Sequence, residues 1–110
     1  MTQLEARKFA DVSTTHVEHT DIPLLDQLAD QYDCGFAQAP LGAPILYKYE
    51  EGYFIYCGSD VFDELVRPYA AAGLSTAFLD LLKLANAQDM AYLNLDSAGE
   101  IYTDLPTFDW

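Results

Sequence analysis

Alternating apolar and polar residues predict paired strands in two parts of the chain. Residues 45–49 and 53–57 are rich in aromatic and β-branched side chains and flank Glu50-Glu51-Gly52, whose glycine suits a tight turn. Residues 90–95 and 100–102 flank Asp96-Ser97-Ala98-Gly99 in a similar way. We therefore expect a central hairpin and a closing hairpin, preceded by a short first strand over residues 7–12.

A helix-start signal is formed by Asp21 and Pro23. The Asp side chain accepts from the unpaired N–H groups of a first helical turn, and proline's fixed φ suits that turn. The helix is predicted to cover about residues 22–32, with Leu24, Leu25 and Leu28 in its buried stripe.

Two further helices are predicted after the central hairpin. Ser75 suits the N-cap of a helix over residues 76–87, whose apolar residues recur at helical spacing and make it mostly buried. Asp60 suits the N-cap of a shorter helix over about residues 61–66, which Pro68 makes difficult to extend.

The resulting order of elements, β-α-β-β-α-α-β-β, predicts an α+β fold in a single small domain over residues 1–110. Hairpins favour an antiparallel or mixed sheet, here of about four to five strands, with two to three helices packed on one face. A doubly wound parallel sheet is not expected, because it needs strands that alternate regularly with helices.

The charge balance is strongly acidic, with 18 Asp and Glu against 5 Lys and Arg and a formal net charge of −13. Such a charge repels nucleic acid and anionic membranes and attracts basic surfaces, with a strength that falls as salt rises. The chain is expected to be folded rather than disordered, because it contains 8 Tyr, 6 Phe and 1 Trp. A halophile's surface could carry the same excess of acid.

No run of the chain is long and apolar enough to span a membrane, and residues 1–5 do not resemble the start of a signal peptide. We therefore expect a cytoplasmic protein. In a reducing cytosol Cys34 and Cys57 would remain thiols, and their spacing matches no zinc motif.

Clusters of carboxylates are the first candidate site for binding a partner. Residues one helical turn apart stand about 5 to 6 Å from each other, a spacing comparable with neighbouring phosphates of a nucleic acid. An ordinary solvated face is the alternative for any one cluster. The candidate carboxylates are Asp26, Asp30 and Asp33 on the first helix, Glu50 and Glu51 at the hairpin tip, and Asp60, Asp63 and Glu64 after it.

Tyrosines of the central hairpin are the second candidate, because an exposed tyrosine next to carboxylates makes a good interface anchor. Tyr47 and Tyr49 share one face of their strand, and Tyr53 begins the next strand. Filling of the core or the sheet is the alternative role for each of them.

Enzymatic signatures are weak. The sequence contains no phosphate-binding loop, nucleophile elbow or zinc-protease helix, and nothing singles out a catalytic carboxylate pair. His16 and His19, near Glu18 and Asp21, form the only metal-like pattern, and a solvated loop is the favoured reading of it. We expect no catalysis, no cofactor and no bound metal.

The end of the chain resembles a known family. Residues 92–100, Tyr-Leu-Asn-Leu-Asp-Ser-Ala-Gly-Glu, lead to 105–110, Leu-Pro-Thr-Phe-Asp-Trp, and residues 12–16 read Val-Ser-Thr-Thr-His. These blocks resemble small plasmid- and phage-borne bacterial proteins that finish in Leu-Pro-Thr-aromatic-Asp-Trp, a domain family of unknown function. The resemblance implies that the protein is encoded on mobile genetic elements, whose small acidic proteins often inhibit host defence. It transfers no catalytic residue. Physically, Phe108 and Trp110 can pin the tail onto the core.

Three hypotheses follow. The first is an inhibitor that mimics nucleic acid, of the anti-CRISPR or anti-restriction type, bound to a basic surface of a CRISPR effector or restriction enzyme. The second is a non-catalytic accessory module of a mobile element that binds through the tyrosine-rich hairpin or an edge strand. The third, the least favoured, is a metal-dependent protein built on His16 and His19. A homodimer is compatible with any of them.

Overall fold

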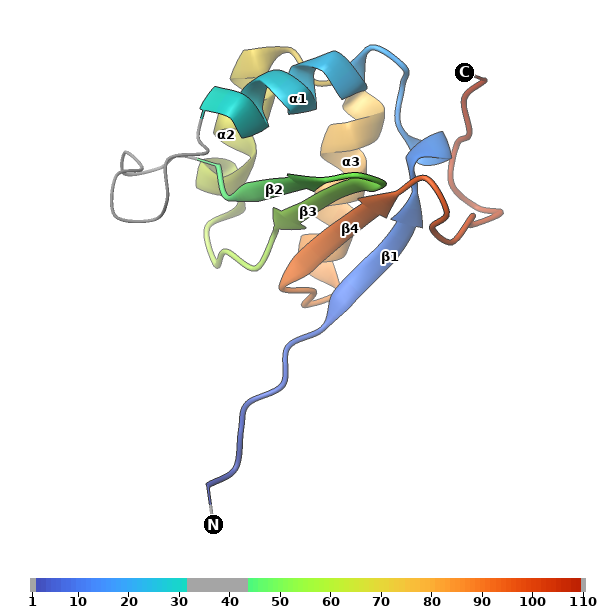
Figure 1. The fold of residues 1–110 in the computed structure, drawn as a ribbon. Coiled ribbons are helices and arrows are strands. Elements are labelled where there is room, and N and C mark those ends of the chain that lie inside the picture. Colours follow the sequence, from blue (N-terminus) through green and yellow to red (C-terminus); the bar gives the residue numbers. More distant parts are fainter. Residues whose placement is uncertain (1, 32–43, 110) are drawn as a thin grey trace.

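The computed structural model of the chain describes residues 2–31 and 44–109, which form one α+β layer structure with a four-stranded sheet and helices on one of its faces (Figure 1). The strand order is β1-β4-β3-β2. The elements are β1 Phe9–Ser13, the 3-10 helix η1 Thr14–His16, α1 Asp21–Gln31, β2 Leu46–Tyr49, β3 Gly52–Tyr56, α2 Phe62–Ala72, α3 Thr76–Ala87 and β4 Tyr92–Asp96. The predicted fold class is confirmed.

The central hairpin is confirmed, and a glycine fixes how closely its strands approach the next one. Strands β2 and β3 pair antiparallel, with Leu46 opposite Ile55 and Tyr49 opposite Gly52. A Cβ atom on Gly52 would lie 1.9 Å from the carbonyl oxygen of Leu95, so a residue with a side chain cannot occupy this position without moving β4.

The predicted closing hairpin is wrong. Strand β4 lies in the middle of the sheet, where it pairs parallel with β1 and antiparallel with β3. Both of its edges are therefore occupied, and residues 100–102 cannot add to it as a further strand. They cross the end of β1 instead, where the Glu100 carbonyl accepts from the Ser13 N–H at 2.9 Å.

Two of the helix predictions hold and one needs correction. Helix α3 has the predicted bounds, and its Ser75 cap accepts from the Phe78 N–H. Helix α1 begins at Asp21 itself, one residue before the predicted start, and the Asp21 carboxylate accepts from the Glu18 N–H and from Ser75. Helix α2 was expected to end near residue 66 but runs through Pro68 to Ala72, because the fully buried Tyr69 keeps this turn packed on the core.

The start of α2 also differs from the prediction. Its N-cap is Val61, which makes no side-chain cap, and Asp60 is exposed. Proline lacks the N–H that would bond the carbonyl four residues earlier, so Pro68 leaves the Glu64 carbonyl without its helical donor.

The side chains of alternate strand residues separate the sheet into a buried face and an open one. Val12, Leu93, Leu95 and Ile55 point toward the helices and are 3% exposed or less. With Leu25, Phe78 and Leu82 from the helices they form the centre of the core. Within residues 2–31 and 44–109, the other face of the sheet carries no helix (Figure 1).

The C-terminal segment, residues 100–109, is held by a buried histidine. His16 Nε2 accepts from the Tyr102 N–H at 2.8 Å, so its Nδ1 carries the proton and donates to the Pro106 carbonyl at 2.7 Å. The Phe108 N–H donates to the Thr15 carbonyl at 2.9 Å, and the Phe108 side chain is half-buried. Leu105 of this segment packs against the core. Packing of the Phe108 ring onto the core stays a prediction, and Trp110 lies outside the described residues.

Candidate functional site

The helix-free face of the sheet, called here the open face, gathers aromatic side chains from all four strands. The strand register places Phe9, Tyr92 and Tyr56 in one cross-strand row and Asp11, Asn94, Phe54 and Tyr47 in the next. A third row contains Asp96 and Tyr49. Together the three rows make up the open face, whose members are Phe9, Asp11, Tyr47, Tyr49, Phe54, Tyr56, Tyr92, Asn94 and Asp96.

The aromatic rings of the open face form a connected cluster. Phe54 stacks on Tyr92 with ring centroids 4.6 Å apart, and Phe9 lies 5.9 Å from Phe54. Tyr56 meets Tyr92 edge-on at 5.8 Å. Phe9 and Tyr47 are 54% and 50% exposed. No helix of the described residues covers this cluster, which therefore offers apolar area for a partner to bury.

The opposite end of the open face is polar. The Tyr49 hydroxyl lies 2.5 Å from Asp96 Oδ2 and 2.7 Å from Asn94 Oδ1. Desolvation, together with the hydrogen bond and charge of Asp96, raises the pKa of Tyr49 to about 12. The hydrogen bonds from Tyr49 and from the Ala98 N–H lower the pKa of Asp96. Asp96 is therefore an anion at neutral pH.

Glu50 and Glu51 extend this polar end at the turn between β2 and β3. Glu51 accepts a hydrogen bond from the Ser97 hydroxyl at 3.0 Å, and its carbonyl accepts from the Ser97 N–H at 2.9 Å. The two turns are thus joined, and they hold Glu51 beside Asp96. The two sequence-predicted carboxylates of the hairpin tip lie next to the open face, and both are exposed.

The carboxylates predicted on α1 do not act as one set. Asp26 pairs with Lys48 at 2.9 Å and accepts a hydrogen bond from the Tyr53 hydroxyl. Desolvation raises the pKa of Asp26, but the hydrogen bonds from Tyr53 and Lys48 and the Lys48 charge outweigh it and lower the pKa. Asp30 is exposed, and Asp33 lies outside the described residues. Asp26 is therefore engaged within the fold.

Tyr53 was expected as a possible exposed anchor, and the structure corrects this. It is 4% exposed, because it lies on the buried face opposite Lys48 and Leu95. Desolvation and its bond to Asp26 raise the pKa of its hydroxyl. Tyr47 and Tyr49 are 50% and 37% exposed and share the open face as predicted.

Phe9, Phe54 and Tyr92 are members of the open face that the sequence interpretation did not select. The sequence signal for them is that alternate residues of a strand point to opposite faces of the sheet. Phe54 lies between the buried residues Tyr53 and Ile55, and Tyr92 lies between the buried residues Ala91 and Leu93. Both faces of β3 carry large side chains, so the sequence alone does not reveal which face the helices cover.

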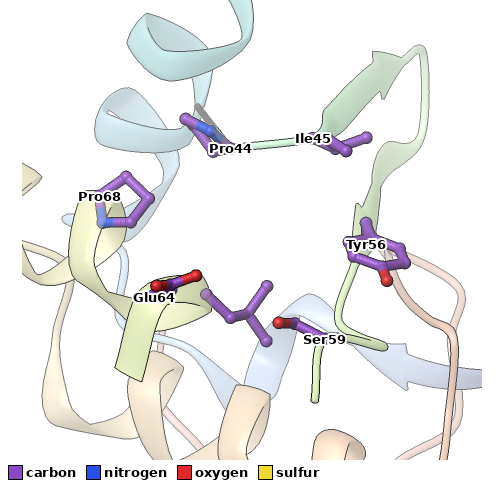
Figure 2. A pocket seen from close by; sticks show the side chains of 7 residues that line it. Pro44, Ile45, Tyr56, Ser59, Glu64 and Pro68 are labelled. Carbon is purple, nitrogen blue, oxygen red and sulfur yellow. The ribbon is translucent and has the colours of Figure 1, made fainter. Parts of the chain in front are cut away.

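Asp60, Asp63 and Glu64 lie at the start of α2, away from the hairpin tip, and all three are exposed. Glu64 lines a hollow of about 140 Å³ between α2 and the base of the β2–β3 hairpin (Figure 2). Tyr56 of the open face lines the same hollow.

A second hollow, of about 240 Å³, lies along β1, an edge strand of the sheet. Leu81 and Leu84 of α3, Met90 and Leu105 line it, together with the carboxylates of Asp11 and Asp104. Leu84 is 40% exposed.

Metal binding and thiol chemistry find little support in the described part of the chain. Both ring nitrogens of His16 are used in hydrogen bonds to the C-terminal segment. Across residues 2–31 and 44–109, no group of three or more His, Cys, Asp and Glu is placed to hold a metal ion. Burial raises the pKa of the Cys57 thiol to about 11, which disfavours the reactive thiolate. Cys34 lies outside the described residues.

No helix in the described residues is long and apolar enough to cross a membrane. Residues 9–110 match the model of the C-terminal domain of DUF5983, a family of unknown function, and the chain therefore belongs to this family. No curated protein and no solved structure matches the chain. The match agrees with the resemblance of the chain's end to a family of unknown function, while an origin in plasmids or phages stays a prediction.

Proposed function

We propose that this member of the DUF5983 family is a non-catalytic protein-binding domain that docks its open face on a basic surface of a nucleic-acid-binding protein and blocks that surface. The observation that supports it is the juxtaposition on one helix-free face of an aromatic cluster, around Phe54 and Tyr92, with the carboxylates of Glu51 and Asp96. Exposed aromatic side chains can anchor an interface, and neighbouring negative charges complement a basic partner surface.

The charge of the whole domain supports a basic partner. Only 5 Lys and Arg accompany 18 Asp and Glu, so most carboxylates lack a Lys or Arg within the chain. The ion pairs Arg7–Glu5 and Lys48–Asp26 use two of the basic residues and lie off the polar end of the open face. A net charge of −13 would steer the domain toward lysine- and arginine-rich surfaces.

Direct binding of nucleic acid is an alternative function for a sheet face with exposed aromatic rings. Sheet faces with exposed aromatic rings stack the bases of single strands in several RNA-binding folds, which add a positive groove for the phosphates. Here Asp11, Asp96 and the adjacent Glu51 would face those phosphates instead, and like charges repel. A partner that itself binds nucleic acid has the complementary charge, and the domain would then compete with its nucleic acid.

A domain that competes with nucleic acid for its partner would inhibit that partner. The proposed inhibitor is of the anti-CRISPR or anti-restriction type. The basic grooves of CRISPR effectors and restriction enzymes bind a polyanion mainly through its phosphates. A domain that presents carboxylates together with stacking rings offers the same two kinds of contact.

A second candidate function is favoured by the hollow along β1. Its lining by Leu84, Met90 and Leu105 beside an edge strand fits an accessory module that receives an extended peptide of a partner. Such binding would rest on apolar burial and main-chain hydrogen bonds, so it would tolerate salt and would not compete with nucleic acid.

The experiment is a pull-down with the purified domain from a bacterial lysate that contains CRISPR and restriction complexes, eluted by a salt gradient and repeated with competing DNA. The proposal predicts a nucleic-acid-binding complex that elutes with salt and is displaced by DNA. A salt-resistant partner that DNA leaves in place would support the accessory module instead. Retention of the DNA itself by the domain would overturn both.

A further inference from the structure

The hollow between α2 and the base of the hairpin combines apolar walls with one carboxylate, that of Glu64. One wall is formed by Glu64 and Pro68 of α2. The facing wall is formed by Ile45, Tyr56 and Ser59 at the base of the hairpin (Figure 2). Pro44 and Leu65 complete the lining. The volume is about 140 Å³, enough for part of a long side chain and too small for a cofactor.

We propose that this pocket binds one arginine side chain of the partner protein, as an anchor next to the open face. The inference rests on the proposed function, because it specifies the chemistry of the same partner. The apolar walls would cover the aliphatic stem, and the Glu64 carboxylate would pair with the guanidinium.

The pocket is continuous with the open face through one side chain. Tyr56 lines the pocket and also contacts Tyr92, whose ring stacks on Phe54 at the centre of the aromatic cluster. A partner that covers the cluster therefore brings its neighbouring residues to the mouth of the pocket. Binding energy at interfaces concentrates on a few anchor side chains that fill such pockets, and arginine is one of the residue types enriched among them.

The local charge favours a cation despite the helix end nearby. Glu64 belongs to the first turn of α2, and the N-terminus of a helix carries roughly half a positive charge. Asp60, Asp63 and Glu64 bring three carboxylates to this end, all exposed, and together they outweigh it. The basic side chain of α2 itself, Arg67, does not line the pocket.

Arginine fits the lining better than lysine does. Its planar guanidinium stacks on aromatic rings and offers several donors, so it can contact the Tyr56 ring and the Glu64 carboxylate at once. The hydroxyl of Ser59, which also lines the pocket, is a further acceptor. It already exchanges hydrogen bonds with the Val61 backbone in its own turn. A lysine ammonium would be limited to the charge of Glu64.

The first test uses N-acetyl-arginine amide as the probe, titrated into the ¹⁵N-labelled full chain and followed by NMR. We expect saturable shifts at the amides of Tyr56, Ser59 and Leu65, with weaker binding of N-acetyl-lysine amide and none of the citrulline analogue, which has the same shape without the charge. Glu64→Gln should weaken arginine binding about tenfold. Asp63→Asn, which removes one adjacent charge without touching the pocket, should weaken it less than about twofold.

The second test measures the affinity of the partner found in the pull-down for the same two variants. A larger loss for Glu64→Gln than for Asp63→Asn supports the anchor pocket. Equal losses, with no arginine-amide shifts at the pocket, overturn the pocket and leave the proposed function standing. Saturable arginine-amide binding at the pocket in a domain that has no basic partner supports the pocket and contradicts the proposed function.

Discussion

Asp21 and Ser75 join the starts of two helices. Asp21, the first residue of α1, is fully buried, and its carboxylate accepts from the Ser75 N–H at 2.8 Å and from the Ser75 hydroxyl at 2.6 Å. The same carboxylate accepts from the Glu18 N–H at 2.9 Å. Ser75 in turn caps α3 by accepting from the Phe78 N–H. One buried side chain therefore orients the N-cap residue of α3.

Replacing Asp21 by alanine should destabilise the domain by about 2 to 4 kcal/mol, because three donors would lose their acceptor in a buried site. Urea unfolding at neutral pH measures the loss. Asp80→Ala is the matched control, since Asp80 is an exposed residue of α3 and its replacement should change the free energy of unfolding by less than about 0.5 kcal/mol. Equal effects of the two substitutions would show that the Asp21–Ser75 contact does not matter.

His16→Ala should release the C-terminal segment. The substitution removes both the acceptor of the Tyr102 N–H and the donor to the Pro106 carbonyl, in a side chain that is 2% exposed. We expect a loss of about 2 to 3 kcal/mol in unfolding free energy and faster hydrogen exchange at the Tyr102 amide.

His19→Ala is the control, because His19 lies three residues away and is exposed. Unchanged protection of Tyr102 in His16→Ala would contradict the role assigned to His16. In the wild-type protein, the NMR shifts of the ring nitrogens should identify the neutral form with the proton on Nδ1.

The Asp26–Lys48 pair should make stability depend on pH. The pKa of Asp26 is lowered in the folded state from its ordinary value of 3.8, so its contribution is complete above that value and is lost as pH falls through the folded pKa. The difference in unfolding free energy between the wild type and Asp26→Asn should therefore be positive at pH 7 and shrink below about pH 4. Asp30→Asn, which changes an exposed carboxyl one helical turn further along α1, is the matched control variant. A difference that grows on acidification would contradict the assigned pairing.

Local signals in the sequence were sufficient for the hairpin and for α3. The Gly52 turn and the Ser75 cap each act within a few residues, so their elements could be placed from the sequence. The position of β4 could not, because its parallel pairing with β1 joins residues about eighty positions apart and no turn specifies it. The same non-local pairing explains why residues 100–102 were mistaken for a strand.

The open face was predicted only in part, for a related reason. Tyr47 and Tyr49 were grouped correctly because they alternate on one strand. Their contact with the rows of Phe54 and Asn94 depends on the strand order, which the sequence does not specify. Tyr53 was misjudged because β3 is large and apolar on both faces, so only the position of the helices decides which side is buried.

The most direct test of the open face is the affinity of the salt-eluted partner for two matched double variants that remain folded by circular dichroism. Tyr47→Ser with Glu51→Gln removes one exposed apolar side chain and one charge at the open face, whereas Leu84→Ser with Asp80→Asn removes the same kinds of group from α3. We predict that the open-face variant binds at least about tenfold more weakly and that the α3 variant changes affinity by less than about threefold. The opposite order of losses would contradict the open-face account and would assign binding to the hollow along β1.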